Sequence, residues 1–203
     1  MPDLPTLLMA ADRWLFLAIN QTLQNPVCDL LMPAVSDKRY AVLPALILAA
    51  ILAIRGGRRA WAWFAIAALA VAGADGAGNL LKHATERIRP CHVEAGVRLV
   101  GSCTHSFAMP SNHAANTAAV AIIAWLGLPR WGWLLAVLAA LVGFSRVYLG
   151  VHYPGDVLVG AVLGATLGGL LVLAVRRVWP QIFGGRFPGR PDPVDRSDEK
   201  QDT

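Results

Sequence analysis

The sequence predicts an all-α membrane protein, a polytopic bundle of five to six transmembrane helices. Its 203 residues are 56% hydrophobic and 15% charged, and the mean hydropathy is +0.50. A soluble domain carries about 25% charged residues. Five apolar runs with little charge between them would leave a soluble bundle without a polar exterior. Lipid is therefore the expected solvent for most of the surface.

The N-terminal segment, residues 1–36, is predicted to be a helix that lies on the membrane surface. Apolar residues recur near helical spacing at Leu7, Leu8, Ala11, Leu15 and Ala18. Asp12 and Arg13 interrupt them, which favours an interfacial helix, with a sixth span as the alternative. The segment lacks the basic start and the small-residue cleavage site of a signal peptide.

The membrane core is predicted over residues 37–180. Its spans are expected at residues 40–54, 60–74, 114–128, 131–144 and 157–175. A span needs roughly 20 residues, so several runs are expected to extend into their flanks. In the last run Gly160, Gly164 and Gly168 recur every four residues, which permits close helix approach. We expect this approach within the bundle rather than in a dimer.

Residues 181–203 form the third part of the chain. They are rich in Gly, Pro and charge, a composition that predicts a disordered tail.

Charges in the loops predict the orientation. In a five-span arrangement one side receives Arg55, Arg58, Arg59, Arg130, Arg176 and Arg177. By the positive-inside rule this side is cytoplasmic, and Trp61, Trp63, Trp131, Trp133 and Trp179 cluster on it. Residues 83–113 and 145–156 then face outward. We expect a bacterial inner-membrane protein with its polar loops toward the periplasm.

The net charge of +5 is modest. With neither a basic stripe nor a recognition motif, no nucleic-acid partner is expected.

Two cysteines, Cys91 and Cys103, lie in the predicted outward loop, where oxidation is possible. A disulfide between them is predicted, with two free thiols as the alternative. Cys28 would remain unpaired.

Ionisable residues cluster at the ends of the predicted spans on the outward side. Ionisable residues in membrane segments are rare and usually functional. The clustered residues are Lys82, Arg89, His113, Arg146, His152 and Asp156, together with Ser111. The cations suit a phosphate dianion, whose oxygens the guanidinium fork matches in pairs. Pro110 suits the first turn of a helix. The backbone N–H groups after it would form an anion site, to which Ser111 adds a hydroxyl donor.

The two histidines suggest phosphoryl transfer. His152 can attack phosphorus if its second ring nitrogen is held by a carboxylate, and Asp156 is suitably placed four residues on. His113 is then available to protonate the departing oxygen. The alternative for Asp156 is that it only caps a helix.

Polar residues outside this set are open to two interpretations. Asp75, Asn79, Lys82 and Glu86 recur on one helical face. Asp75 is expected to pair with a site cation or to hydrogen-bond a neighbouring helix. Asn116 and Thr117, one turn beyond His113, are expected to orient that histidine or to pack.

Three stretches together resemble a known signature. They are Lys82-x6-Arg89-Pro90, Pro110-Ser111-Asn112-His113 and Ser145-Arg146-x5-His152-x3-Asp156. In residue types, spacing and order they resemble the type 2 phosphatidic acid phosphatase superfamily. That superfamily includes membrane lipid phosphatases, glucose-6-phosphatase and vanadium-dependent haloperoxidases.

The resemblance implies a role for each residue. His152 would be the nucleophile, Asp156 its orienting partner, and His113 the general acid and then the base that activates water. The phosphoryl oxygens would be bound by Lys82, Arg89, Ser111, Arg146 and the backbone of Asn112. The family usually has glycine at the position of Asn112, so the departure there bears on headgroup preference. No metal and no cofactor are expected, because the cations supply the charge neutralisation.

The expected substrate is a membrane lipid phosphate. Undecaprenyl diphosphate is preferred, with the 1-phosphate of lipid A and phosphatidylglycerophosphate as alternatives. Two other classes stay open, a vanadate-dependent haloperoxidase and a non-catalytic membrane lipid-binding scaffold. The sequence leaves the oligomeric state open.

Overall fold

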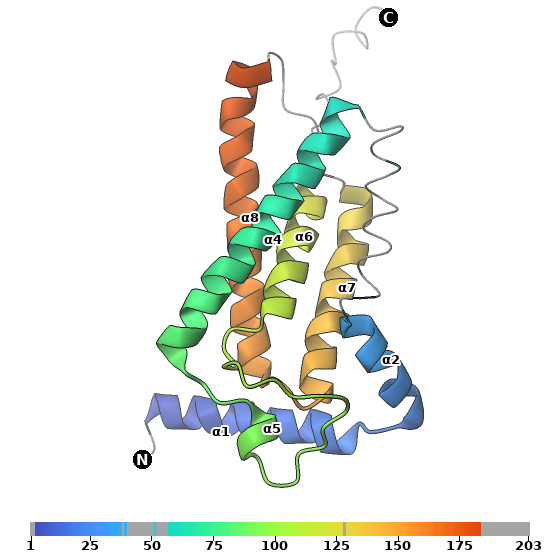
Figure 1. Cartoon of the computed structure of the whole chain (residues 1–203), viewed down its shortest axis with the longest axis vertical. Helices are drawn as coiled ribbons and strands as arrows, with labels where there is room; N and C mark the ends of the chain where they lie inside the picture. Colours follow the sequence, from blue (N-terminus) through green and yellow to red (C-terminus); the bar gives the residue numbers. More distant parts are fainter. Residues whose placement is uncertain (1–2, 38, 40–50, 52–56, 128, 184–203) are drawn as a thin grey trace, which may run out of the picture.

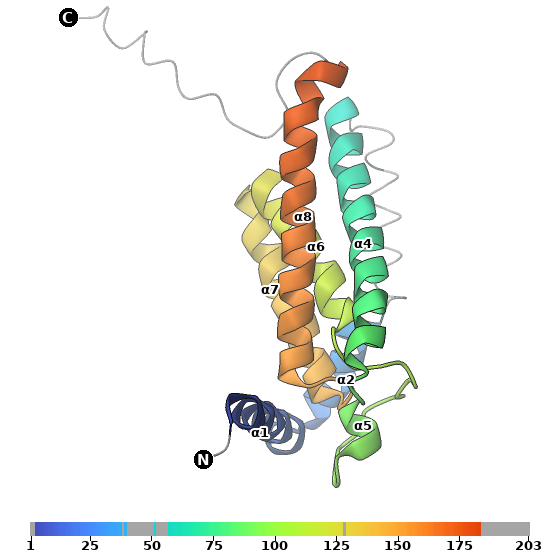
Figure 2. The same ribbon diagram turned by 90° about the vertical axis from the view of Figure 1, so that its left-hand side faces the viewer.

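The computed structural model describes residues 3–37, 39, 51, 57–127 and 129–183. Four long helices run side by side along the longest axis of the molecule (Figure 1). They are α4 (Arg58–Thr85), α6 (Asn112–Gly127), α7 (Pro129–Tyr148) and α8 (Pro154–Phe183). Helix α6 packs against each of the other three, so it forms the centre of the bundle (Figure 2).

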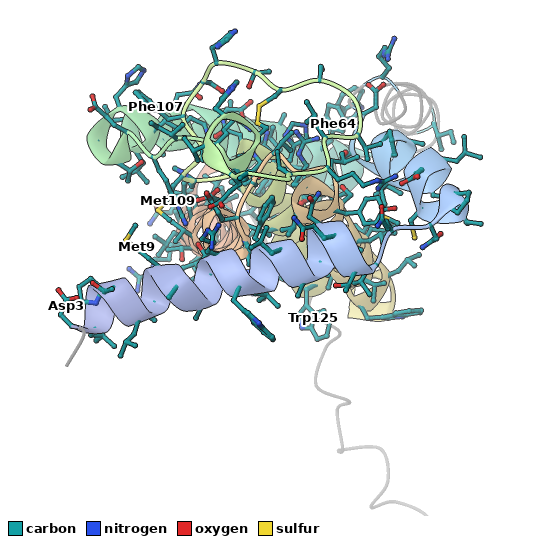
Figure 3. All side chains as sticks on the ribbon, turned by 90° about the horizontal axis from the view of Figure 1, so that it is seen from below. Asp3, Met9, Phe64, Phe107, Met109 and Trp125 are labelled. Atoms are coloured by element: carbon teal, nitrogen blue, oxygen red, sulfur yellow. A yellow bond between two sulfur atoms is a disulfide. The ribbon has the colours of Figure 1, made fainter. Side chains whose placement is uncertain are left out.

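Shorter helices close one end of this bundle. Helix α1 (Leu4–Leu17) continues into the π-helical turn η1 (Ala18–Thr22), and α2 (Pro26–Ser36) follows. The one-turn helix α5 (Pro90–Val93) lies in the long connection between α4 and α6. Viewed from that end, α1 crosses beneath the bundle (Figure 3).

The helical fold class is confirmed, and within the described residues two helices are long and apolar enough to cross a membrane. The apolar stretches run over Trp61–Val93 and Pro154–Gln181. The predicted runs 60–74, 131–144 and 157–175 lie within α4, α7 and α8, and the run 114–128 lies in α6 up to its end at Gly127. The predicted run 40–54 lies outside the described residues apart from residue 51. The total of five to six spans stays a prediction.

Helix α4 continues eleven residues past the predicted run, to Thr85. Its polar second half is stabilised by hydrogen bonds to α6 described below. The helix stops at Glu86, whose φ of 46° lies in the left-handed region and whose N–H caps the carbonyl of Lys82 at 2.9 Å. This turn redirects the chain, so that the segment after α4 runs back beneath the bundle.

The glycines of α8 bring it into close contact with α6. A Cβ at Gly160 or Gly164 would collide with the carbonyl oxygen of Ser111 or Ala115, and one at Gly168 would lie 2.9 Å from that of Ala119. The prediction that this repeat serves packing inside the bundle is confirmed. The first of these contacts fixes the start of α6 against the start of α8.

Apolar side chains fill the bundle and its closed end separately. Within the bundle, one cluster contains Ile66, Ala70, Ala119, Ile123 and Val172. At the closed end Phe16 of α1 packs on Val147 and Tyr153. Met32 of α2 packs on Tyr148, Leu149 and Val151. The N-terminal helices are thus seated against the turn between α7 and α8.

Candidate active site

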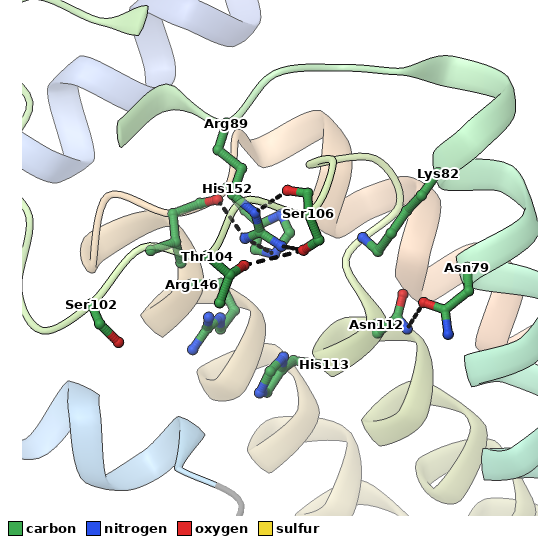
Figure 4. A pocket seen from close by; sticks show the side chains of 11 residues that line it. Asn79, Lys82, Arg89, Ser102, Thr104, Ser106, Asn112, His113, Arg146 and His152 are labelled. Carbon is green, nitrogen blue, oxygen red and sulfur yellow. Dashed lines mark hydrogen bonds between the residues drawn. The ribbon is translucent and has the colours of Figure 1, made fainter. Parts of the chain in front are cut away.

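A pocket of about 210 Å³ lies where α4 and α7 end and where α6 and α8 begin. It is lined by Asn79, Lys82, Arg89, Ser102, Thr104, Ser106, Asn112, His113, Arg146, Val151 and His152 (Figure 4). Of the predicted site residues, Ser111 and Asp156 are not on its wall. Both are fully buried behind it.

Two of the three cations are held by neutral oxygens. The Lys82 ammonium lies 3.1 Å from the carbonyl of Phe107 and also contacts that of Pro110. The Arg89 guanidinium donates to the carbonyl and hydroxyl of Ser106 at 2.7 and 2.9 Å, and to the carbonyl of Val151 at 3.0 Å. Both side chains are buried. These bonds position the charges without neutralising them.

The third cation comes from the last turn of α7. Arg146 donates from Nη1 to the hydroxyl of Ser36 at 3.1 Å, and its buried Nε has no hydrogen-bond partner among the described residues. In the described part of the chain no carboxylate pairs directly with Lys82, Arg89 or Arg146. The pocket therefore presents uncompensated positive charge, which suits a dianion.

His152 lies between a cation and a carboxylate. Its Nε2 is 3.1 Å from Nη1 of Arg89. Because a guanidinium can only donate, this nitrogen accepts the bond, and its lone pair is directed at Arg89 on the pocket wall. The proton then belongs on Nδ1, which lies 3.5 Å from Oδ2 of Asp156 and makes no hydrogen bond among the described residues. Burial, reinforced by Arg89 and the other two cations, lowers the pKa of His152 well below 6.5. The imidazole is thus neutral and poised as a nucleophile.

Asp156 both caps a helix and faces the histidine. Its Oδ2 accepts the N–H of Tyr153, the residue before α8, at 2.8 Å. This is the back-reaching half of a capping box. Its Oδ1 accepts a bond of 2.8 Å from Nη1 of Arg87. The helix cap expected of Asp156 is therefore confirmed, and its role as the orienting partner of His152 stays a prediction.

The start of α6 differs from the prediction in one respect. The helix begins at Asn112, so Pro110 precedes the first turn instead of opening it. The N–H of Ser111 donates to the carbonyl of Asp156 at 2.9 Å, and the Ser111 carbonyl accepts the N–H of Ala115 at 3.0 Å. The backbone N–H of Ser111 is thus used in joining α6 to α8. Its buried hydroxyl has no partner among the described residues.

Asn112 connects the pocket wall to α4. Its amide donates to Asp75 at 3.1 Å and to Oδ1 of Asn79 at 3.0 Å. Asn116, one turn on, also donates to Asp75, at 2.9 Å. Asp75 therefore hydrogen-bonds a neighbouring helix, which was one of its two predicted roles. The side chain that replaces the usual glycine of the signature joins two helices at the pocket.

Sequence reasoning missed several parts of the site. Arg87, two residues before Arg89, was not singled out, although alternate residues of an extended segment share one side. The alternating hydroxyls of Ser102, Thr104 and Ser106 were also missed. The predicted disulfide between Cys91 and Cys103 is present, and Cys28 is free. Ser102 lies inside the loop that this disulfide closes, and Thr104 and Ser106 follow it directly.

A helical bundle that buries a histidine–aspartate pair beside uncompensated cations has the features of an enzyme that acts on phosphate groups. The PAP2 superfamily model matches residues 61–180. The chain belongs to the PAP2 superfamily.

Three similar proteins carry the names of lipid phosphatases. The lipid A 4'-phosphatase of Bacteroides thetaiotaomicron is 31% identical over 82% of this chain and 78% of its own length. Decaprenylphosphoryl-5-phosphoribose phosphatase of Mycobacterium tuberculosis is 40% identical over 62% of this chain and 68% of its own length. Undecaprenyl-diphosphatase of Sulfolobus acidocaldarius is 34% identical over 47% of each chain, so the match spans about half of that relative.

Two solved structures share the fold. The crystal structure of Aquifex aeolicus LpxE superposes with a TM-score of 0.67 at 25% identity, over 78% of this chain and 93% of that one. A transmembrane PAP2-type phosphatidylglycerolphosphate phosphatase from Bacillus subtilis gives the same TM-score and identity, over 84% and 87%. Both likenesses cover most of the bundle.

Proposed function

We propose that this chain is an integral membrane phosphatase that hydrolyses a lipid-linked phosphate or diphosphate through a phosphohistidine at His152. The observation that carries the proposal is the position of Nε2 of His152, a residue of the pocket wall, 3.1 Å from Nη1 of Arg89. A phosphate that enters would take over the Arg89 N–H bonds and bring its phosphorus to this nitrogen.

In the first step the Nε2 lone pair forms the P–N bond while the bond from phosphorus to the leaving oxygen breaks. His113 donates a proton to that oxygen. The Nδ1 proton stays on the ring and faces Asp156, whose charge stabilises the cationic phosphoimidazole. Lys82, Arg89 and Arg146 hold the phosphoryl oxygens as charge shifts toward them.

In the second step a water attacks phosphorus and gives its proton to His113. The P–N bond breaks, its electron pair returns to Nε2, and inorganic phosphate leaves. His113 is then protonated again and His152 is neutral again. The chain thus returns to its starting state without a metal or a redox partner.

Undecaprenyl diphosphate is our preferred substrate, with lipid A and phosphatidylglycerophosphate as alternatives. The preference is supported by relatives named for polyprenyl lipids, an undecaprenyl-diphosphatase and a decaprenylphosphoryl-5-phosphoribose phosphatase. We further propose that the protein lies in a bacterial inner membrane with its site toward the periplasm. Arg130 in the first turn of α7 and Arg176 near the end of α8 support this orientation, because both are remote from the site end of the bundle.

The test is phosphate release by detergent-purified protein in the presence of EDTA. The panel contains undecaprenyl diphosphate, lipid A, phosphatidylglycerophosphate and phosphatidic acid. We expect release by the native chain and by His105→Ala, whose exposed ring stacks on His92 outside the pocket. We expect none from His152→Ala. Equal release by His152→Ala, or release that EDTA abolishes in the native chain, would exclude this mechanism.

A further inference from the structure

The surface helix α1 reaches the catalytic pair through one side chain, that of Asp12. Its Oδ2 accepts a bond of 2.6 Å from Nη2 of Arg87, and its Oδ1 accepts the N–H of Gly155 at 2.7 Å. Gly155 lies in the first turn of α8, whose N-terminal dipole favours a carboxylate. A single residue of α1 therefore contacts both the segment after α4 and the start of the helix that carries Asp156.

Arg87 divides its guanidinium between two carboxylates. Nη1 donates to Oδ1 of Asp156 at 2.8 Å, while Nη2 donates to Oδ2 of Asp12. The same guanidinium lies 4.2 Å above the ring of Tyr153, which fixes its plane. The three charged side chains are between 0% and 21% exposed, so water screens their interactions only partly.

We propose that Asp12 is a positioning residue for the His152–Asp156 pair, acting through Arg87. This inference rests on the proposed function, because it concerns the same catalytic pair. Asp12 occupies one arm of the guanidinium fork, so Arg87 can take only one oxygen of Asp156. The other oxygen stays with the N–H of Tyr153 and in front of Nδ1 of His152.

Removal of the Asp12 charge would release that arm. A guanidinium binds a carboxylate most strongly with two parallel N–H bonds. Arg87 would therefore turn toward both oxygens of Asp156, compete with the N–H of Tyr153 for Oδ2 and draw this oxygen away from Nδ1 of His152. The imidazole would lose the partner that orients it and stabilises its cationic form. Substrate binding would be spared, because Lys82, Arg89 and Arg146 do not contact Asp12.

Gly155 provides an independent way to disturb the same contact. A Cβ at this position would lie 2.8 Å from Oδ2 of Asp12. Gly155→Ala would push the carboxylate away from Arg87 without changing any charge.

Arg13 provides the matched control on α1. Its Nε donates to Glu94 at 2.7 Å, and its side chain is 55% exposed. Arg13→Gln weakens the seating of α1 by one ion pair but leaves the Asp12–Arg87 contact in place. A general loosening of α1 would therefore appear in both variants, whereas a positioning effect would appear only at Asp12.

The experiment measures kcat and KM for phosphate release by the full chain and its variants, with a thermal melt of each. At metal sites, loss of a residue that orients a ligand typically lowers activity by about 10- to 100-fold, and we take the same order for the residue that orients Asp156. We expect that fall in kcat for Asp12→Asn with KM unchanged, partial recovery in Asp12→Glu and native kcat in Arg13→Gln. If Asp12→Asn does not fold, Gly155→Ala is expected to show the same kcat loss.

The outcomes separate this inference from the proposed function. No release by the native chain would contradict the proposed function itself. An active native chain with equal kcat in Asp12→Asn and Arg13→Gln would overturn the positioning role alone. A rise in KM without a fall in kcat would overturn it as well, since it would assign Asp12 to binding.

Discussion

The ring nitrogens of His152 are distinguished by their neighbours. Arg89 can only donate to Nε2, and Asp156 can only accept from Nδ1 while both groups are ionised. The same arrangement explains why the imidazole stays neutral, since burial and the surrounding cations disfavour a positive charge on it. A neutral nucleophile on the pocket wall is the state that phosphoryl transfer requires.

This environment predicts how His152 titrates. Its pKa is lowered from 6.5 in the folded protein. Below 6.5 the unfolded chain binds a proton that the folded chain does not, so stability falls as the pH drops through that window. NMR of the isotope-labelled histidines, assigned by difference with His152→Asn, should find this ring neutral below pH 6.5. A His152 signal that titrates at or above 6.5 would contradict the burial account.

Single residues also mark the limit of sequence reasoning. The signature predicted six of the polar side chains on the pocket wall, because their types and order suit phosphate chemistry: Lys82, Arg89, Asn112, His113, Arg146 and His152. It did not predict that the N–H of Ser111 is bonded to the carbonyl of Asp156. Nor did it predict Arg87 between Asp156 and Asp12. Both depend on how the start of α8 meets distant segments, which spacing along the chain does not encode.

At the scale of elements, α6 is held between two different surfaces. On one side Asn112 and Asn116 bond to Asp75 of α4. On the other side the glycines of α8 allow the backbone of α6 to approach closely. These two helix contacts therefore fix the positions of the site residues at the start of α6. The contact with the glycines of α8 was predictable from their four-residue repeat.

The glycine contact predicts a sharp difference between two substitutions in α8. Gly164→Ala places a methyl group against the carbonyl of Ala115, while at Gly169 a Cβ would meet nothing within 4 Å. Overpacking typically costs about 1–3 kcal/mol, and a chain of this size loses roughly 2–4 °C of Tm per kcal/mol.

Thermal melts in detergent should therefore show a lower Tm for Gly164→Ala. Gly169→Ala should be neutral or slightly stabilising, because alanine favours the helix. Equal melting temperatures in the two variants would mean that α6 and α8 do not depend on this close approach.

For the whole molecule, the termini of four helices converge on one pocket at one end. The alternating directions of α4, α6, α7 and α8 bring together residues as distant as Lys82 and His152. Helix α1 adds a surface layer beneath that end, with exposed apolar side chains that include Leu8 and Trp14. Hydropathy predicted the long helices. Hydropathy did not predict where α1 crosses, because its position depends on the packing of Phe16 against Val147 and Tyr153 and on the polar contacts of Asp12 and Arg13.

The central claim is that phosphate passes through a bond to His152, and trapping that intermediate tests it most directly. The His113→Ala variant is mixed with radiolabelled undecaprenyl diphosphate, whose phosphate leaving group departs with little help from the general acid. The mixture is quenched in alkali and digested for peptide mapping. Without the base that activates water, the account predicts label on the peptide that contains His152, stable in alkali and lost in acid. A variant that turns over substrate yet carries no label, or carries it on another residue, would contradict the mechanism.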